Sequence, residues 1–139
     1  MNVTTKDIGT ALRTKLNVAS IQALGVASGD VFDSVASKAG VRPFVRYQMI
    51  DAGDEETFGQ RVYQWFEMLV VAHTADDRDK ASNIGAEIDT LLQRTSLTIS
   101  GATHDITFRR RQFERFENGP DGRVYYQSGG IYYIGVRPS

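Results

Sequence analysis

The chain has 139 residues, of which 41% are hydrophobic and 24% charged, and its 16 Lys and Arg residues nearly balance its 17 Asp and Glu residues. This composition is typical of a folded domain, and the net charge of −1 argues against a protein built to bind nucleic acid or a membrane surface. The absence of cysteine excludes a disulfide scaffold, thiol catalysis and Cys-ligated metal centres. We expect one domain over residues 1–139, with neither a signal peptide nor a transmembrane helix, because no apolar stretch is long enough.

The first expected elements are a helix and two strands. Apolar residues recur at helical spacing over Thr5–Leu16, and Thr4 with Asp7 three residues later has the pattern of a capping box. A short strand is expected over Val31–Val35, and a longer one over Phe44–Ile50.

The middle of the chain predicts a hairpin followed by the second principal helix. Asp51–Gly59 is polar and acidic, so we expect a long hairpin loop there. Val62–Ala72 is the most hydrophobic run, with apolar residues at odd and even positions. We interpret it as a central strand covered on both faces, at least in its second half, with a buried helix as the alternative. A helix is expected over Ala75–Gln93, with Thr74 as its capping residue.

The last third of the chain predicts a second hairpin. Asp105–Glu117 is expected to be a strand with a bulge near Arg110–Gln112, because its apolar residues change parity there. Asn118–Gly122 predicts the turn, and Arg123–Arg137 the partner strand, with a second bulge at Gly129–Gly130. The fold class is therefore α+β, with a mainly antiparallel sheet of four or more strands packed with two principal helices.

Few residues have a spacing that indicates catalysis or metal binding. The only two histidines, His73 and His104, fit no metal-binding motif, and we expect each to be a packing or surface residue. The acidic residues of the expected loop lack the spacing of a calcium-binding loop, so solvated charge is the simpler interpretation. We therefore expect no catalytic residue, no cofactor and no bound metal.

Two oppositely charged segments are the candidates for assembly contacts. The acidic set is Asp51, Asp54, Glu55 and Glu56, and the basic set is Arg109, Arg110, Arg111, Arg115 and Arg123. The arginines have three interpretations: a charged strand edge that resists aggregation, a contact with an acidic surface of a neighbouring copy, or a contact with the DNA backbone. Aromatic residues on both strands of the final hairpin predict cross-strand pairing and a surface suited to protein contacts.

The layout of the chain resembles the tail terminator, or tail-completion, proteins of long-tailed bacteriophages and gene transfer agents. The resemblance rests on Gly29–Asp33, on the strand start at Arg42–Val45, on the helix ending near Leu91 and Leu92, and on the closing strand Gly130–Val136. It implies a non-enzymatic α+β subunit without a cofactor. Such subunits form a hexameric ring that caps the head-proximal end of the tail tube, stops its growth and joins it to the head connector.

The resemblance also implies partners and a location. The implied partners are further copies of the chain, the tail tube protein and the head connector proteins; packaged DNA would be near, and no membrane is involved. The implied location is the tail or neck of a virion that is assembled in the host bacterial cytoplasm. In such a ring, we expect the acidic set and the basic set to approach each other across subunits or on a docking partner. The alternatives are another neck or tail component, such as a head-completion or tube protein, and a small α+β ligand-binding domain or enzyme.

Overall fold

The structure is a computed structural model that describes residues 3–33, 43–57 and 60–138. Its helices are α1 (Thr5–Leu16), α2 (Ala19–Gln22) and α3 (Arg78–Leu92). Its strands are β1 (Val31–Asp33), β2 (Phe44–Thr57), β3 (Gln60–Ala75), β4 (Ala102–Asn118) and β5 (Val124–Pro138). The predicted α+β class is confirmed. None of the described helices is both long and apolar enough to cross a membrane.

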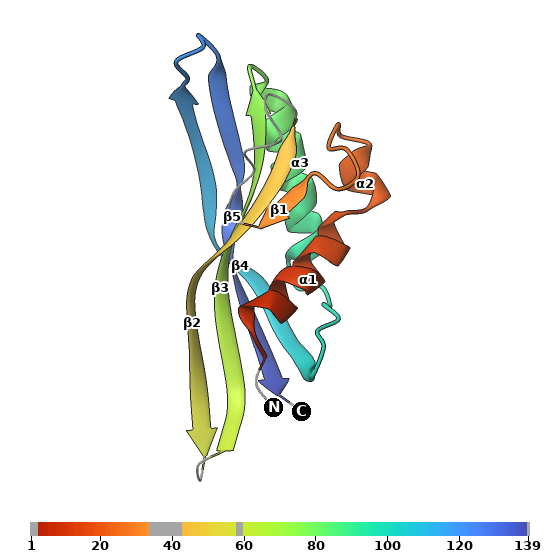
Figure 1. Cartoon of the computed structure of the whole chain (residues 1–139), viewed down its shortest axis with the longest axis vertical. Coiled ribbons are helices and arrows are strands. Elements are labelled where there is room, and N and C mark those ends of the chain that lie inside the picture. Colours follow the sequence, from red (N-terminus) through yellow and green to blue (C-terminus); the bar gives the residue numbers. More distant parts are fainter. Residues whose placement is uncertain (1–2, 34–42, 58–59, 139) are drawn as a thin grey trace.

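The five strands form one sheet in the order β1-β2-β3-β5-β4. Its strand pairs are antiparallel except β1 with β2, which is parallel. The sheet is thus built from two hairpins, β2–β3 and β4–β5, joined by the pairing of β3 with β5, and β3 is the central strand as predicted. The two hairpins extend in opposite directions from the middle of the molecule, and all three helices lie on the same side of the sheet (Figure 1).

The hydrophobic core lies between the helices and one face of this sheet. The fully buried side chains of α1 and α3 recur at helical spacing and pack over alternate residues of the central strands. They are Ile8, Leu12 and Leu16 from α1, Ile84, Ile88 and Leu92 from α3, and Met68, Val70, Tyr132 and Ile134 from β3 and β5.

The helix starts follow local capping chemistry, with one correction. The capping box of Thr4 and Asp7 at the start of α1 is confirmed, as are the bounds of that helix. The predicted start of α3 at Ala75, capped by Thr74, is wrong. The cap is Asp77, whose carboxylate accepts a hydrogen bond from the Lys80 N–H at 2.9 Å. The backbone up to Ala75 belongs to β3 instead, because it pairs with β5.

The predicted hairpin loop over Asp51–Gly59 is also wrong in its extent. β2 continues to Thr57 and pairs with β3 from Asp51 opposite Glu67 to Glu55 opposite Tyr63. β3 pairs with the backbone groups of this acidic segment that face it, and the charged side chains of the segment remain exposed. A bulge in β2 at Ile50 precedes the segment.

The bulges of the second hairpin lie in β4 and not in β5. The register shifts between Arg109 and Arg111, as predicted, and again between His104 and Ile106. The predicted bulge at Gly129–Gly130 is wrong, because both glycines pair in regular register with β3 and β4. Their small size serves close packing: a Cβ at Gly129 would collide with the Val70 carbonyl.

The sequence predicted that β3 is covered on both faces, at least in its second half; the burial of that half agrees with this prediction, whereas the placement of the helices does not. Val70, Val71 and Ala72 are fully buried. The helices of the described residues nevertheless cover one face alone (Figure 1). For the strand predicted over Val31–Val35, residues 34 and 35 lie outside the described residues.

Candidate functional site: the helix-free face and the outer edges of the sheet

The face of the sheet that carries no helix presents half-buried apolar side chains from several strands. Along β3 the even-numbered residues from Gln64 to Thr74 are buried beneath the helices, whereas most odd-numbered residues point to the other side and are half-buried. We call this other side the helix-free face. Its apolar residues lie side by side on neighbouring strands: Tyr63, Trp65, Leu69, Val71, Ile106, Phe108, Phe113, Ile131 and Tyr133.

Aromatic rings lie stacked along the helix-free face. The ring centroid of Tyr133 is 6.1 Å from that of Trp65 and 5.1 Å from that of Phe108, with interplanar angles of 15° and 27°. The Arg110 guanidinium lies 5.8 Å from the Tyr133 ring centroid and forms an ion pair with Glu67. This stacked row forms a broad apolar surface with charge at its margin, which is the composition of a protein interface.

Glycines on neighbouring strands let these rings lie close to the sheet. A Cβ at Gly53 would be 2.5 Å from the Trp65 ring, and one at Gly135 would collide with the Tyr63 hydroxyl. The sequence predicted this face only in part: Phe113 and Tyr133 belong to the aromatic residues of the final hairpin that we expected to form a surface suited to protein contacts, whereas the contribution of β3 was not predicted. The available signal was the apolar character of both parities in Val62–Ala72, which we interpreted as coverage on both sides.

The two histidines lie on opposite faces and are each engaged. His73 stacks on Phe44 with ring centroids 4.4 Å apart, and its Nε2 accepts a hydrogen bond from Arg46 Nε at 3.2 Å. Burial, together with the Arg46 charge, lowers the pKa of His73 to about 4, so the ring is neutral at pH 7. His104 Nε2 is 2.7 Å from the Thr107 hydroxyl, and burial lowers its pKa. The described residues contain no group of three or more His, Asp and Glu residues placed to hold a metal.

The structure divides the arginines between the two faces. Arg109 points to the helix side, where its Nε is 3.6 Å from the Asp89 carboxylate. The bulge turns Arg111 to the helix-free face, in the same row as Ile131. The Arg109–Arg111 run is therefore not one patch.

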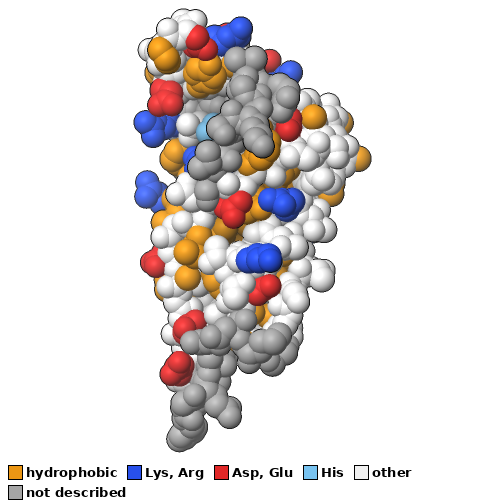
Figure 2. Space-filling view, viewed as in Figure 1, with side chains coloured by type: hydrophobic (Ala, Val, Ile, Leu, Met, Phe, Trp, Pro, Cys, Tyr) orange, Lys and Arg blue, Asp and Glu red, His pale blue; other side chains and the backbone are white. Residues whose placement is uncertain are grey.

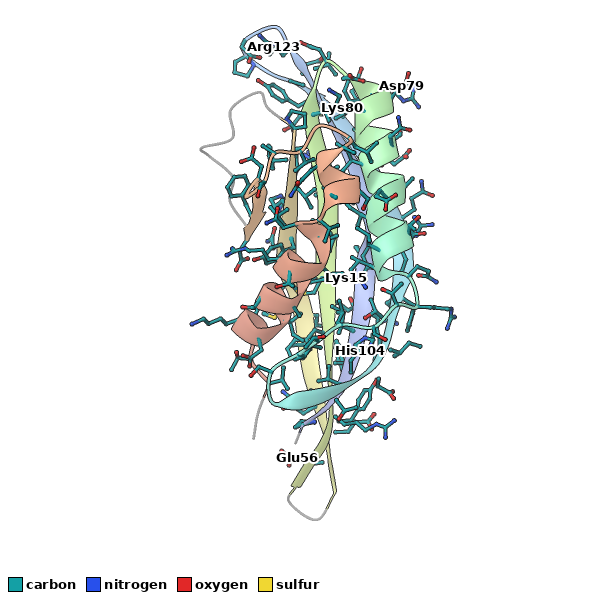
Figure 3. All side chains as sticks on the ribbon, turned by 90° about the vertical axis from the view of Figure 1, so that its right-hand side faces the viewer. Lys15, Glu56, Asp79, Lys80, His104 and Arg123 are labelled. Atoms are coloured by element: carbon teal, nitrogen blue, oxygen red, sulfur yellow. The ribbon has the colours of Figure 1, made fainter. Side chains whose placement is uncertain are left out.

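The remaining candidate residues lie towards the two ends of the molecule. Arg123 is in the turn region of the β4–β5 hairpin and pairs with Asp76 at 3.3 Å, whereas Glu56 lies near the tip of the β2–β3 hairpin at the other end (Figure 3). Arg115 forms an exposed ion pair with Glu117 at 3.6 Å. On the face seen in Figure 2, acidic side chains are spread from the top to the lower part, whereas basic ones lie in the middle and upper parts. Within one chain, the acidic set and the arginines of β4 are thus on opposite edges of the sheet.

Two surface grooves flank the helices on the covered side. One, of about 510 Å³, lies between the start of α3 and the β4–β5 hairpin and is lined by Arg78, Ser82, Phe116 and Tyr126, among others. The other, of about 780 Å³, lies between α1 and residues 96–100. Neither histidine lines either groove.

Comparison with known proteins relates the chain to a virion component by fold. No protein-family model and no curated protein sequence matches it. A solved chain from the virion of a native gene transfer agent particle is similar over 94% of this chain and 94% of its own length, with a TM-score of 0.73 and 16% sequence identity. A second solved chain covers 99% of this chain and 97% of its own length, with a TM-score of 0.56 and 14% identity. At these identities the likeness shows a shared fold.

Proposed function

We propose that this protein is a structural component of a phage or gene transfer agent virion. More specifically, we propose that it forms a ring that caps the head-proximal end of the tail tube and joins the tube to the head connector. The observation that carries the proposal is the fold shared with a chain of a gene transfer agent virion over nearly the full length of both chains. The layout of the sequence points to the same class of protein independently.

The surfaces of the sheet support a role in assembly. A monomer would leave the aromatic row of Trp65, Tyr133 and Phe108 half-exposed on the helix-free face, together with long strand edges. Contacts between copies in a ring would bury such surfaces. The proposal includes that the protein is not an enzyme, and the engagement of His73 by Arg46 and Phe44 is in keeping with it.

The experiment that tests this function is disruption of the gene in a strain that produces the particles, followed by electron microscopy. Loss of a cap that stops tube growth predicts tails of abnormal length that are not joined to filled heads. Supplying the intact gene in trans should restore joined particles of uniform tail length.

The alternatives predict different particles. A tube protein predicts the absence of tails, and a head-completion protein predicts tails of normal length beside heads that have lost DNA. Either result would assign the chain to another component of the virion, and unchanged particles would contradict a structural role in the virion.

A further inference from the structure

We propose that copies of this chain join edge to edge, with β2 of one copy pairing antiparallel to β4 of the next, Asp51–Glu55 lying against Arg111–Arg115. This contact would join the subunits of the proposed ring. Only the expectation that the ring closes rests on the proposed function. The proposal is carried by four observations: the two strand edges that are left open, the direction of their backbone groups, their charges and their exposed apolar residues.

Each outer strand has one covered and one open stretch. Among the described residues, β1 pairs with β2 only at Val45–Tyr47, which leaves the outer edge of β2 open from Gln48 onward. On the other side of the sheet, the Thr107 carbonyl accepts a hydrogen bond from the Arg94 N–H, and the Arg109 N–H donates to the Gln93 side chain. The turn after α3 therefore covers this part of β4.

From Arg111 to Asn118, the described residues provide β4 with backbone partners on β5 alone. An open edge of this length is a template for a further strand. The two open stretches lie at opposite edges of the same sheet, which is the arrangement that lets each copy contact two neighbours.

In both open stretches, every second residue directs its backbone N–H and C=O groups to the open edge, and the positions of these residues on the two strands can be matched. In an antiparallel ladder, alternate residues direct their N–H and C=O groups to the outer side, and a bulge shifts this alternation by one residue. On β4, the backbone groups of Thr107 and Arg109 point to the outer edge of the sheet. The bulge at Arg110 shifts the alternation, so beyond it the residues whose backbone groups point to this edge are Gln112 and Glu114.

On β2 the same reasoning applies. The Val45 N–H donates to the Asp30 carbonyl, on the outer edge of β2. After the bulge at Ile50, the residues whose backbone groups point to this edge are therefore Ala52 and Asp54. In agreement, the Ala52 N–H donates to the Asp51 carboxylate at 2.9 Å. An antiparallel register that sets Ala52 opposite Glu114 and Asp54 opposite Gln112 therefore aligns donors with acceptors on both strands.

That same register aligns opposite charges. It sets Asp51 opposite Arg115 and Glu55 opposite Arg111, and in each copy all four side chains lie on the helix-free face. Asp51, Glu55 and Arg111 form no ion pair within the described part of the chain, so they are available for such contacts. Charged pairs of this kind fix register and partner choice.

The charges also select against the wrong pairings. Two β4 edges paired antiparallel over this stretch would set Arg111 against Arg115, and two β2 edges would set Asp51 against Glu55. Both symmetric dimers therefore bring like charges together, whereas the β2–β4 contact is favourable. Contacts between two different surfaces are the kind that continues around a ring.

Two exposed apolar side chains meet at the end of this register. Ile50 and Phe116 are 49% and 66% exposed in the single chain, and they lie among its most exposed large hydrophobic residues. The register brings Ile50 of one copy beside Phe116 of the next, at the groove between α3 and the β4–β5 hairpin. The contact would bury both side chains.

The register can be tested by disulfide trapping, because the chain has no cysteine of its own. Asp51 and Arg115 would form a pair without backbone hydrogen bonds, with Cα atoms about 4.5 Å apart, which is within reach of a disulfide. The full-length variant Asp51→Cys with Arg115→Cys should give, on oxidation, a ladder of covalent oligomers that ends at the closed ring.

The matched control is Asp51→Cys with Arg111→Cys, which replaces the same two residue types. Here the cysteines would be about 13 Å apart along the strand, and oxidation should give no ladder. Both variants are oxidised as purified protein at high concentration and within particles. A ladder from the control as strong as that from the first variant, or no ladder from the first variant in either setting, would overturn the proposed register.

Charge reversal provides a second, independent readout. Glu55→Arg or Arg111→Glu alone should weaken association by about tenfold or more in light scattering, and the two changes combined in one chain should restore it. Lys6→Glu, an exposed change on α1, is the control for added negative charge. Failure of the combined variant to recover, with its melting temperature unchanged, would contradict the contact. Trapping in purified protein without any effect of gene disruption on particles would instead refute the virion function and leave the contact standing.

Discussion

The two faces of the sheet differ in what covers them and in what their side chains contribute. On the covered face, Leu12 of α1 and Ile88 of α3 are fully buried with residues of β3 and β5. On the helix-free face, Leu69 and Ile131 belong to the same strands but are half-buried. The same strands thus carry two apolar surfaces, of which one stabilises the single chain and the other is suited to contacts between chains.

The two faces should differ most in how much stability is lost when one of their aliphatic side chains is truncated. Ile88→Ala should lower the free energy of unfolding by about 2–5 kcal/mol, because it opens a cavity in the core. Leu69→Ala on the helix-free face should cost about 1 kcal/mol, because less of its surface is removed from water. Urea unfolding of dilute protein measures both, and equal losses would contradict the distinction between the faces.

A second effect comes from His73, whose ring is enclosed between Phe44 and Arg46. The pKa of His73 is about 4 in the folded chain and 6.5 in the unfolded chain, so the unfolded state binds more protons between these values. The free energy of unfolding should therefore be unaffected by this ring above pH 6.5 and should fall by at most ~3 kcal/mol as the pH is lowered to about 4, because protonation favours the unfolded chain.

Unfolding free energies measured across this pH range test the effect, with His73→Gln as the control. The glutamine oxygen can accept the hydrogen bond of Arg46, but the side chain does not titrate. The variant should show a flatter pH profile than the native chain, and parallel profiles would show that His73 is not responsible.

A third effect concerns the close approach of ring and sheet. Gly53→Ala should destabilise the chain by about 1–2 kcal/mol, because its Cβ would be 2.5 Å from the Trp65 ring. Combination with Trp65→Ala should remove most of the cost of the added methyl group, which a double-mutant cycle measures. Additive losses would mean that the ring does not lie over Gly53.

The smallest effect is that of the ion pair on the helix-free face. The side chains of Arg110 and Glu67 are 50% and 21% exposed, so their coupling in a double-mutant cycle should be about 0.5 kcal/mol. Thermal unfolding of Arg110→Gln, Glu67→Gln and the combined variant gives this number. A coupling above about 2 kcal/mol would show that this face is desolvated in the single chain.

Local signals predicted the elements that depend on neighbouring residues. The helix Thr5–Leu16 and its capping box are determined within one turn, and the turn at Asn118–Gly122 is determined by its own residues. The predictions failed where the structure of a segment depends on pairing with a strand that is distant in the sequence. Asp51–Glu55 has the composition of a loop but pairs with β3, and Gly129–Gly130 has that of a bulge but allows close packing.

The candidate site was predicted as two sets of charges and an aromatic surface on the final hairpin, without their arrangement in the sheet. The acidic and basic sets were chosen from composition, and their placement on opposite edges of the sheet depends on the strand order. The direction of each side chain depends further on the bulges at Ile50 and Arg110, whose positions follow from cross-strand register. No local pattern carries that information, so the correspondence of Asp51 with Arg115 could not be predicted from the sequence.

We propose above that this chain is a virion protein that forms a ring at the junction of head and tail. The most direct measurement is a cryo-electron microscopy map of the neck in particles from a strain that carries the gene. We expect a ring of density at the head-proximal end of the tail tube into which this fold fits, with β2 of each copy beside β4 of the next. A neck mapped at side-chain resolution in which every density belongs to other chains would contradict it.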